Sequence, residues 1–177
     1  MKNNEKNNRV RKICVAAMFA AICAAATMIH VPISATGGYM NLGDVIVLLS
    51  GWLLGPVYGF AAAGIGSALT DLFLGYTTYV PVTFIVKGLM AVAAFFIYKA
   101  FGKDNFAARA VSALVAEIIM VGGYYLCEST FLGYGFIGAL GSIPGNTIQA
   151  VGGLVIACAI YLPIKTAFVK AGSAFKN

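Results

Sequence analysis

Long apolar stretches, separated by short polar or glycine-containing segments, run through most of the chain. Stretches of about 20 apolar residues are typical of helices that cross a membrane. Six spans are expected, at 10–30, 43–57, 59–74, 81–99, 106–127 and 144–164. The second and third are short and are joined by Gly55-Pro56-Val57-Tyr58-Gly59, which predicts a tight reversal. The pattern predicts an all-α polytopic membrane protein with six transmembrane helices in one compact bundle.

The composition agrees with this pattern, because only 10% of the 177 residues are charged and the mean hydropathy is +0.88. Soluble domains carry about 25% charged residues. A cytosolic enzyme and a disordered chain are therefore excluded. The four cysteines show no C-x-x-C spacing and are expected to pack as small apolar residues. We expect one membrane domain over 1–177, with a polar tail at 1–9, a bundle at about 10–164 and a basic tail at 165–177.

The basic residues indicate the topology. Eleven of the twelve lie near the two ends of the chain or at the junction of the fourth and fifth spans (Lys99, Lys103 and Arg109), and the predicted outer loops 31–42, 75–80 and 128–143 contain none. Cytoplasmic loops collect Lys and Arg, so both termini are expected on the cytoplasmic side of the membrane. The first apolar run also resembles a signal peptide, but five more apolar segments follow. This separated charge does not favour a nucleic-acid partner.

Lys87 lies inside the fourth expected span, where an ionisable side chain is costly unless it is paired or faces a cavity. Thr83 precedes it by one helical turn and shares its face. Two interpretations stay open. Lys87 forms a structural ion pair with Asp71 or Glu117, or it donates hydrogen bonds to a ligand that enters from outside.

Further polar residues lie at the same outer depth of the expected bundle. Amides near the start of the last span suit a binding site, although Asn146 could instead cap its helix or make a contact in its first turn. Tyrosines of the outer loops suit ring contacts or interfacial anchoring. Asp44 is expected only to stabilise the start of its helix. The shared depth predicts one outward-facing pocket. Its candidate substrate-binding residues are Tyr39, Asn41, Asp71, Tyr79, Thr83, Lys87, Glu117, Tyr124, Glu128, Asn146 and Gln149.

Motifs of soluble catalysis do not occur in the sequence. It contains no G-x-x-x-x-G-K-[ST] phosphate loop and no H-E-x-x-H, and its single histidine, His30, has no metal-ligand partner at useful spacing. The sequence therefore predicts neither an enzyme nor a metal or cofactor site. Rival functions are a small channel or facilitator and, less favoured, an intramembrane enzyme.

The first expected span carries a flat alanine face formed by Ala16, Ala20 and Ala24. Small residues four apart let helix backbones approach closely in lipid. The residues alone leave open whether the helix packed on this face is internal or belongs to a second protein.

Several motifs resemble, in order, those of the substrate-binding S components of energy-coupling-factor (ECF) vitamin transporters. The resemblance extends from about Gly37 to Gly153, and it is carried by Gly38-Tyr39-Met40-Asn41-Leu42-Gly43-Asp44, Leu54-Gly55-Pro56, Gly66-Ser67-Ala68-Leu69-Thr70-Asp71-Leu72, Thr83-Phe84-Ile85-Val86-Lys87-Gly88 and Ile143-Pro144-Gly145-Asn146-Thr147-Ile148-Gln149. The pattern most resembles the hydroxymethylpyrimidine or pyridoxine members, with riboflavin-type members close by.

This resemblance implies an ABC-type importer subunit that captures a water-soluble vitamin or precursor outside the cell. It implies that the partners are a transmembrane coupling protein and two cytoplasmic ATPase subunits, and that the chain itself lies in the lipid of a bacterial plasma membrane. It also implies that Ala16, Ala20 and Ala24 form the docking face for the coupling protein. The alternatives are another vitamin, such as riboflavin, and a channel that works alone.

Overall fold

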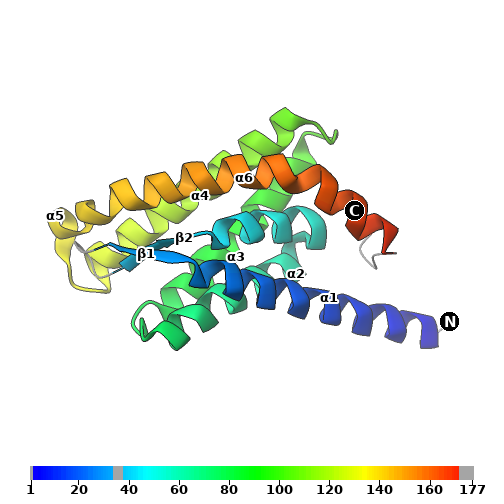
Figure 1. The fold of residues 1–177 in the computed structure, drawn as a ribbon, viewed down its shortest axis with the longest axis horizontal. Helices are drawn as coiled ribbons and strands as arrows, with labels where there is room; N and C mark the ends of the chain where they lie inside the picture. Colours follow the sequence, from blue (N-terminus) through cyan, green and yellow to red (C-terminus); the bar gives the residue numbers. More distant parts are fainter. Residues whose placement is uncertain (1, 34–37, 172–177) are drawn as a thin grey trace.

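The computed structural model describes residues 2–33 and 38–171, most of which are helical (Figure 1). The elements in chain order are α1 (Lys2–Met28), β1 (His30–Ile33), β2 (Gly38–Asn41), α2 (Gly43–Leu74), α3 (Val80–Ala100), α4 (Phe106–Thr130), α5 (Gly135–Ala139), the 3-10 turn η1 (Leu140–Ser142) and α6 (Ile143–Lys170). The predicted tails and first outer loop extend into residues outside this description: 1, 34–37 and 172–177. Within the described residues the helical class is confirmed.

A short antiparallel hairpin, which the hydrophobic pattern did not predict, joins α1 to α2. His30 pairs with Asn41, and Pro32 pairs with Tyr39. The strands are only four residues long each, so they give no clear alternation of apolar and polar positions. The hairpin matters for function because it carries Tyr39 and Asn41 over one end of the bundle (Figure 1).

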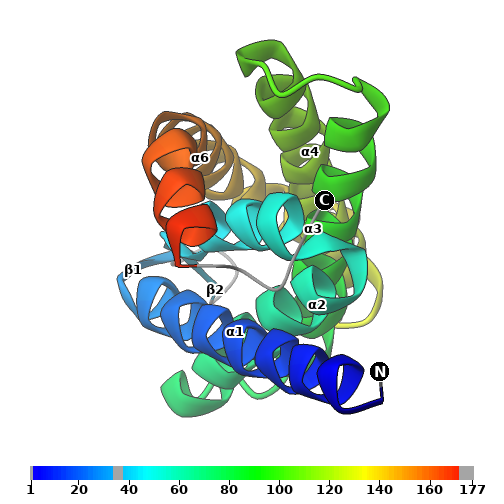
Figure 2. The same cartoon turned by 90° about the vertical axis from the view of Figure 1, so that its right-hand side faces the viewer.

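Helix α2 reverses direction within its length, at the position that the sequence predicts. Gly55 has φ 79° and ψ −177°, a backbone conformation essentially restricted to glycine, and the ring of Pro56 removes a backbone donor there. The Cys23 sulfur lies 4.0 Å from the Gly43 carbonyl oxygen and 3.9 Å from that of Ala63. A straight helix would separate those two carbonyls by about 30 Å. The arms 43–54 and 56–74 therefore lie side by side (Figure 2).

The reversal changes the number of spans. Five helical segments among the described residues are long and apolar enough to cross a membrane, namely Asn7–Met28, Gly43–Leu74, Val80–Ala100, Phe106–Thr130 and Gly135–Lys170. The prediction of six separate spans is not confirmed, because the second and third form one folded-back helix. Its first arm of twelve residues is about 18 Å long, shorter than the roughly 30 Å of a bilayer core.

The folded-back helix forms the centre of the bundle, with α1, α3 and α6 packed around it (Figure 2). Its first arm is almost wholly buried, and it includes Leu48 and Trp52 at 0% and 2% exposure. Small residues allow the close approach of the neighbouring helices: Gly51 lies against the backbone of Ala91 in α3, and Gly66 against that of Ala20 in α1.

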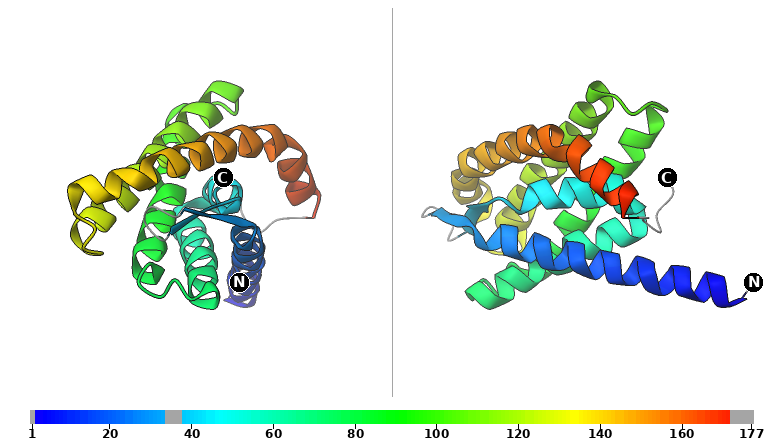
Figure 3. Two further views of the ribbon diagram at one scale, coloured as in Figure 1. Left: turned by 60° about the vertical axis from the view of Figure 1, so that its left-hand side comes forward. Right: turned by 45° about the vertical axis from the view of Figure 1, so that its right-hand side comes forward.

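Both ends of the described chain lie at the same end of the bundle. The Arg11 guanidinium in α1 donates a hydrogen bond to the Ala171 carbonyl oxygen, at 2.9 Å. The hairpin and α5 lie at the opposite end (Figures 1 and 3). The predicted outer loops thus share one end and the basic segments share the other. Which end faces the cytoplasm stays a prediction.

The predicted docking face of α1 is turned inward instead. Ala16 is buried, and Ala20 and Ala24 are half-buried against α2, where the Ala24 carbonyl accepts a 3.0 Å hydrogen bond from the Thr70 hydroxyl. The exposed alanines of α1 are those one position later, Ala17, Ala21 and Ala25. Helical periodicity defines both faces of α1, but only tertiary packing decides which of them α2 covers.

Candidate substrate-binding site

One cavity lies at the hairpin end of the bundle, enclosed by α1, β2, α2, α3, α4 and α6. Its free volume is about 30 Å³, and a water needs about 10–15 Å³ by this measure. The lining residues are Thr27, Tyr39, Asn41, Ser67, Asp71, Tyr79, Thr83, Lys87, Tyr124, Glu128, Asn146 and Gln149. Ten of the eleven candidates from the sequence therefore come together around one space; Glu117 does not line it.

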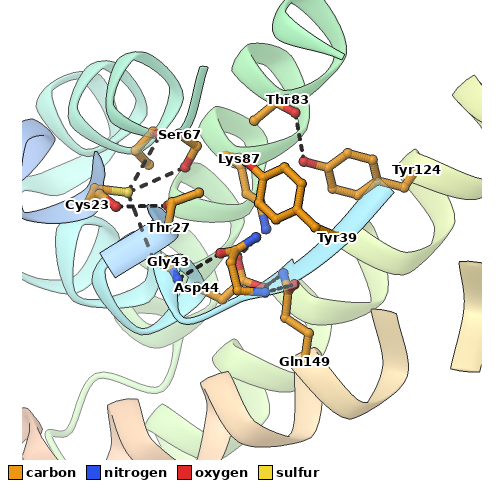
Figure 4. Close-up of polar contacts among 12 residues, drawn as sticks. Cys23, Thr27, Tyr39, Gly43, Asp44, Ser67, Thr83, Lys87, Tyr124 and Gln149 are labelled. Carbon is orange, nitrogen blue, oxygen red and sulfur yellow. Dashed lines mark hydrogen bonds and ion pairs between the residues drawn. The ribbon is translucent and has the colours of Figure 1, made fainter. Parts of the chain in front are cut away.

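Lys87 at the cavity wall is 1% exposed and forms an ion pair with Asp44, which is 0% exposed (Figure 4). The prediction that its partner would be Asp71 or Glu117 is wrong. Asp44 does begin a helix, but the first arm of α2 also lies between α3 and α6, which brings its carboxylate against Lys87. No spacing within the sequence could indicate this meeting.

Gln149 joins the ion pair to the hairpin. Its side-chain Nε2 donates a 2.5 Å hydrogen bond to the second oxygen of Asp44, and its Oε1 accepts a 2.7 Å bond from the backbone N–H of Asn41 (Figure 4). The Asn41 side chain accepts from the Gly43 N–H at 2.8 Å, so it also supports the start of α2. We call Asn41, Asp44, Lys87 and Gln149 the Lys87 network.

Glu117 lies beneath this network rather than at the cavity wall. It is 2% exposed, and neither of its carboxylate oxygens has a hydrogen-bond partner among the described residues. Gly153 leaves room for it, since a Cβ there would lie 2.9 Å from both Glu117 Oε1 and Asp44 Cβ. Eleven residues separate Glu117 from Glu128, about 16 Å along the axis of α4. That depth explains why a residue on the predicted face misses the cavity.

Three lining tyrosines, Tyr39, Tyr79 and Tyr124, form one side of the site, and the ring of Tyr76 packs against two of them. The ring centroids of Tyr39 and Tyr76 are 4.8 Å apart, and those of Tyr76 and Tyr79, and of Tyr79 and Tyr124, are each 6.5 Å apart. The Lys87 ammonium lies 5.5 Å from the centroid of Tyr124. Rings at these separations form a continuous aromatic wall, suited to a flat ligand.

Two carboxylates among the tyrosines also line the cavity. The Tyr39 hydroxyl donates to Asp71 Oδ1 at 2.5 Å, while Glu128 accepts from the Tyr79 hydroxyl at 3.2 Å and from the Ser142 hydroxyl. Burial first, then the negative charge of Asp71, raises the pKa of Tyr39, so its hydroxyl stays a neutral donor. Burial and Glu128 raise the pKa of Tyr79 in the same way.

Two lining residues, Thr27 and Ser67, were missed by sequence reasoning. The Thr27 hydroxyl donates to the Cys23 carbonyl oxygen of its own helix at 2.8 Å, and the Ser67 hydroxyl lies 3.4 Å from the Cys23 sulfur (Figure 4). Single hydroxyl residues inside apolar runs look like ordinary packing residues. Asn146 lies inside the first turn of α6 and lines the cavity, so it is not the helix cap.

Comparisons with known proteins agree with this architecture. Residues 7–166 match the model of a family described as "ECF-type riboflavin transporter, S component". A relative from Pyrococcus woesei, named only as an uncharacterized protein in a gap 3′ region, is 32% identical over 136 residues, which are 77% of this chain and 88% of that protein.

A solved structure, described as the S component of a bacterial ECF transporter, has the same fold. Its TM-score is 0.63 at 21% sequence identity, and the match covers 92% of this chain and 98% of that one. Its likeness bears on the fold alone, whereas the family model matches nearly the whole sequence. By that match the chain belongs to the S-component family of ECF-type riboflavin transporters, which confirms the resemblance seen in its motifs.

Proposed function

We propose that this S component captures a water-soluble vitamin or vitamin precursor in the cavity beneath the hairpin. The observation that carries the proposal is the convergence of polar and aromatic side chains from six elements on one buried space. In a membrane protein such groups are costly unless they are paired or face a cavity, so their gathering around one cavity makes it a candidate binding site. The cavity lies at the end without Lys or Arg in its loops, which supports an outward-facing site and cytoplasmic termini in a bacterial cell membrane.

The cargo we favour is a single-ring compound of the hydroxymethylpyrimidine or pyridoxine type. A free volume of about 30 Å³ requires side chains to move for any vitamin, and one ring demands less movement than three fused rings. Riboflavin is the second candidate, because the matching family is named for its transport.

The decisive experiment is calorimetric titration of the full-length protein in detergent with pyridoxine, pyridoxal, hydroxymethylpyrimidine, thiamine and riboflavin. Nanomolar binding of one compound supports capture and names the cargo. Native mass spectrometry of the freshly purified protein tests for a retained ligand outside this panel. A folded protein that binds nothing by either method, yet transports in vesicles without ATP or partners, would instead be a facilitator.

We further propose that the chain delivers its cargo through a transmembrane coupling protein and two ATPase subunits. The sequence contains no phosphate-binding loop of the G-x-x-x-x-G-K-[ST] type, which agrees with ATP hydrolysis by partner subunits. The inward packing of Ala20 moves the proposed docking face to Ala17, Ala21 and Ala25, which are exposed on α1. Small exposed residues four apart allow the backbone of a partner helix to come close.

Two neighbouring tryptophan substitutions test this docking face. Ala21→Trp on the exposed face should abolish ATP-driven transport and leave ligand titration unchanged. Ala20→Trp, which must displace α2 at Gly66, should weaken binding and lower the unfolding temperature. Transport by Ala21→Trp at the wild-type rate would exclude this face as the docking surface.

A further inference from the structure

The cavity contains a buried acceptor that the described protein does not satisfy. Asp71 is 2% exposed and lines the cavity. Its Oδ1 accepts from Tyr39, but its Oδ2 has no hydrogen-bond partner among the described residues. The Thr83 hydroxyl, a neighbour of Asp71, shares a 2.9 Å hydrogen bond with the Tyr124 hydroxyl in which either group can be the donor. Leaving a buried carboxylate oxygen unpaired is costly, so this oxygen marks where a donor would be bound.

The charge of Asp71 is also left without a counter-charge in direct contact. Lys87 is the basic residue of the cavity wall, and it forms its ion pair with Asp44. Glu128, the other acid of the wall, has a hydroxyl donor on each oxygen. The described part of the cavity therefore has a surplus of acidic groups, Asp71 and Glu128, and of these only Asp71 has an oxygen without a donor. An anionic ligand would be repelled there, and a cationic one attracted.

The aromatic wall favours the same kind of ligand. Tyr39, Tyr76 and Tyr79 are next to one another near Asp71, which Tyr39 contacts directly. Tyrosine faces attract cations, and a flat heterocycle can stack on them at the same time. A carboxylate acceptor beside aromatic faces is the combination that binds an N–H group on a positively charged ring or side arm.

We infer that the cavity selects a single-ring nitrogen heterocycle with a cationic amino group on a side arm, and that Asp71 Oδ2 accepts the hydrogen bond from that group. This inference rests on the proposed capture function and specifies its substrate class. Analogues with a carboxylate or phosphate at the same position are excluded by repulsion, and uncharged analogues bind less tightly because they lose the charge-assisted bond.

The test is titration of the full-length protein in detergent with ring-matched compounds that differ in one substituent. Pyridoxamine, pyridoxine and 4-pyridoxic acid place an amine, a hydroxyl and a carboxylate on the same ring. The aminomethyl, hydroxymethyl and carboxyl forms of the 4-amino-2-methylpyrimidine ring form a second series. In the series that binds, we expect the amine to bind about ten-fold or more tightly than the hydroxyl form, with the carboxylate weakest.

Substitutions assign the preference to one atom. Asp71→Asn keeps the size of the side chain and should reduce the amine preference to less than about three-fold. Glu128→Gln, which alters an acid whose oxygens both have donors, should retain more of the preference. Asp104→Asn, at the opposite end of the bundle, should leave the ranking unchanged. Thermal unfolding in detergent shows whether each variant is folded. The ranking of ligand affinities in the wild-type protein tests the inference even if a variant does not fold.

Each result separates this inference from the broader function. Equal affinity across a series, a preference for the carboxylate, or a full amine preference in folded Asp71→Asn overturns the inference and leaves vitamin capture standing. Nanomolar binding of riboflavin with no binding of either series does the same. If no ligand binds or co-purifies and transport needs no ATP, capture fails as well.

Discussion

Acidic side chains outnumber basic ones at the cavity end of the bundle, whereas at the opposite end one acid is shared by two basic side chains. Four of the six acidic residues of the chain lie around or beneath the cavity with a single lysine, namely Asp44, Asp71, Glu117 and Glu128. At the other end one acid, Asp104, is shared by two cations: Arg109 donates to it at 2.6 Å and Lys165 at 2.5 Å.

The surroundings of the tyrosines also differ between the two ends. At the basic end, Arg109 lies 4.9 Å from the ring centroid of Tyr161, whose hydroxyl is 2.8 Å from that of Tyr98. These contacts tie α3, α4 and α6 together. At the cavity end the lining rings instead border free space, and Asp71 Oδ2 and both oxygens of Glu117 have no donor among the described residues. At the basic end Arg109 Nε is the one buried polar side-chain atom of the described residues without a hydrogen-bond partner. The acid at the basic end is thus paired with two cations, whereas acids at the cavity end keep free acceptors for a ligand.

The largest expected effect comes from removing the lysine of the cavity end. Lys87→Met leaves Asp44 buried without its cation, which should cost about 3–5 kcal/mol of unfolding free energy and abolish ligand binding. The double variant Lys87→Met/Asp44→Leu removes both charges and should recover most of the stability but none of the binding. Thermal unfolding and titration in detergent measure the two outcomes. Binding by the double variant would show that Lys87 is only structural.

The next effect has the opposite sign. Glu117→Met removes a buried carboxyl group without a hydrogen-bond partner among the described residues, and removing its desolvation penalty should stabilise the protein by about 1–3 kcal/mol. Glu117 does not line the cavity, so the ligand affinity should change less than for Lys87→Met. A lower unfolding temperature for Glu117→Met than for wild type would mean that the carboxyl group has a favourable partner. The contrast between paired acids at one end and unpaired acids at the other would then be smaller.

A smaller loss is expected at the glycine that makes room for both carboxylates. Gly153→Ala places a Cβ 2.9 Å from Asp44 and Glu117, which should cost about 1–3 kcal/mol by overpacking. Gly152→Ala, one position earlier in α6, meets nothing within 4 Å and should be neutral or stabilising by up to about 1 kcal/mol. Equal unfolding temperatures for the two variants would contradict this close packing.

The smallest effect is expected at the basic end. Partial burial alone would raise the pKa of Asp104, but bonds from Lys165 and Tyr98, and then the charges of Lys165 and Arg109, lower it. Its contribution to stability is therefore complete above about pH 4 and is lost as the pH falls further. Asp104→Asn should cost about 1 kcal/mol or less at pH 7, with the difference from wild type shrinking near pH 3. Unfolding curves at both pH values measure this.

The sequence predicted which residues lie at the depth of the site, but not which of them bond to one another. Ten lining residues were predicted because polar groups stand out within apolar runs, and the reversal at Gly55 was predicted because glycine and proline occur together there. The partner of Lys87 was not, since Asp44 reaches it only when the first arm of α2 lies between α3 and α6. Contacts between distant segments leave no periodic mark in the sequence.

The hydrogen bond from the Asn41 N–H to Gln149 gives the cavity a spectroscopic reporter. That amide belongs to the hairpin, yet its acceptor also holds Asp44, the counter-ion of Lys87. A ligand that draws Lys87 or Gln149 away from Asp44 must change the exchange rate of this one backbone proton with solvent. Occupancy of a site inside the membrane can thus be followed by isotope exchange at its rim, without a label on the ligand.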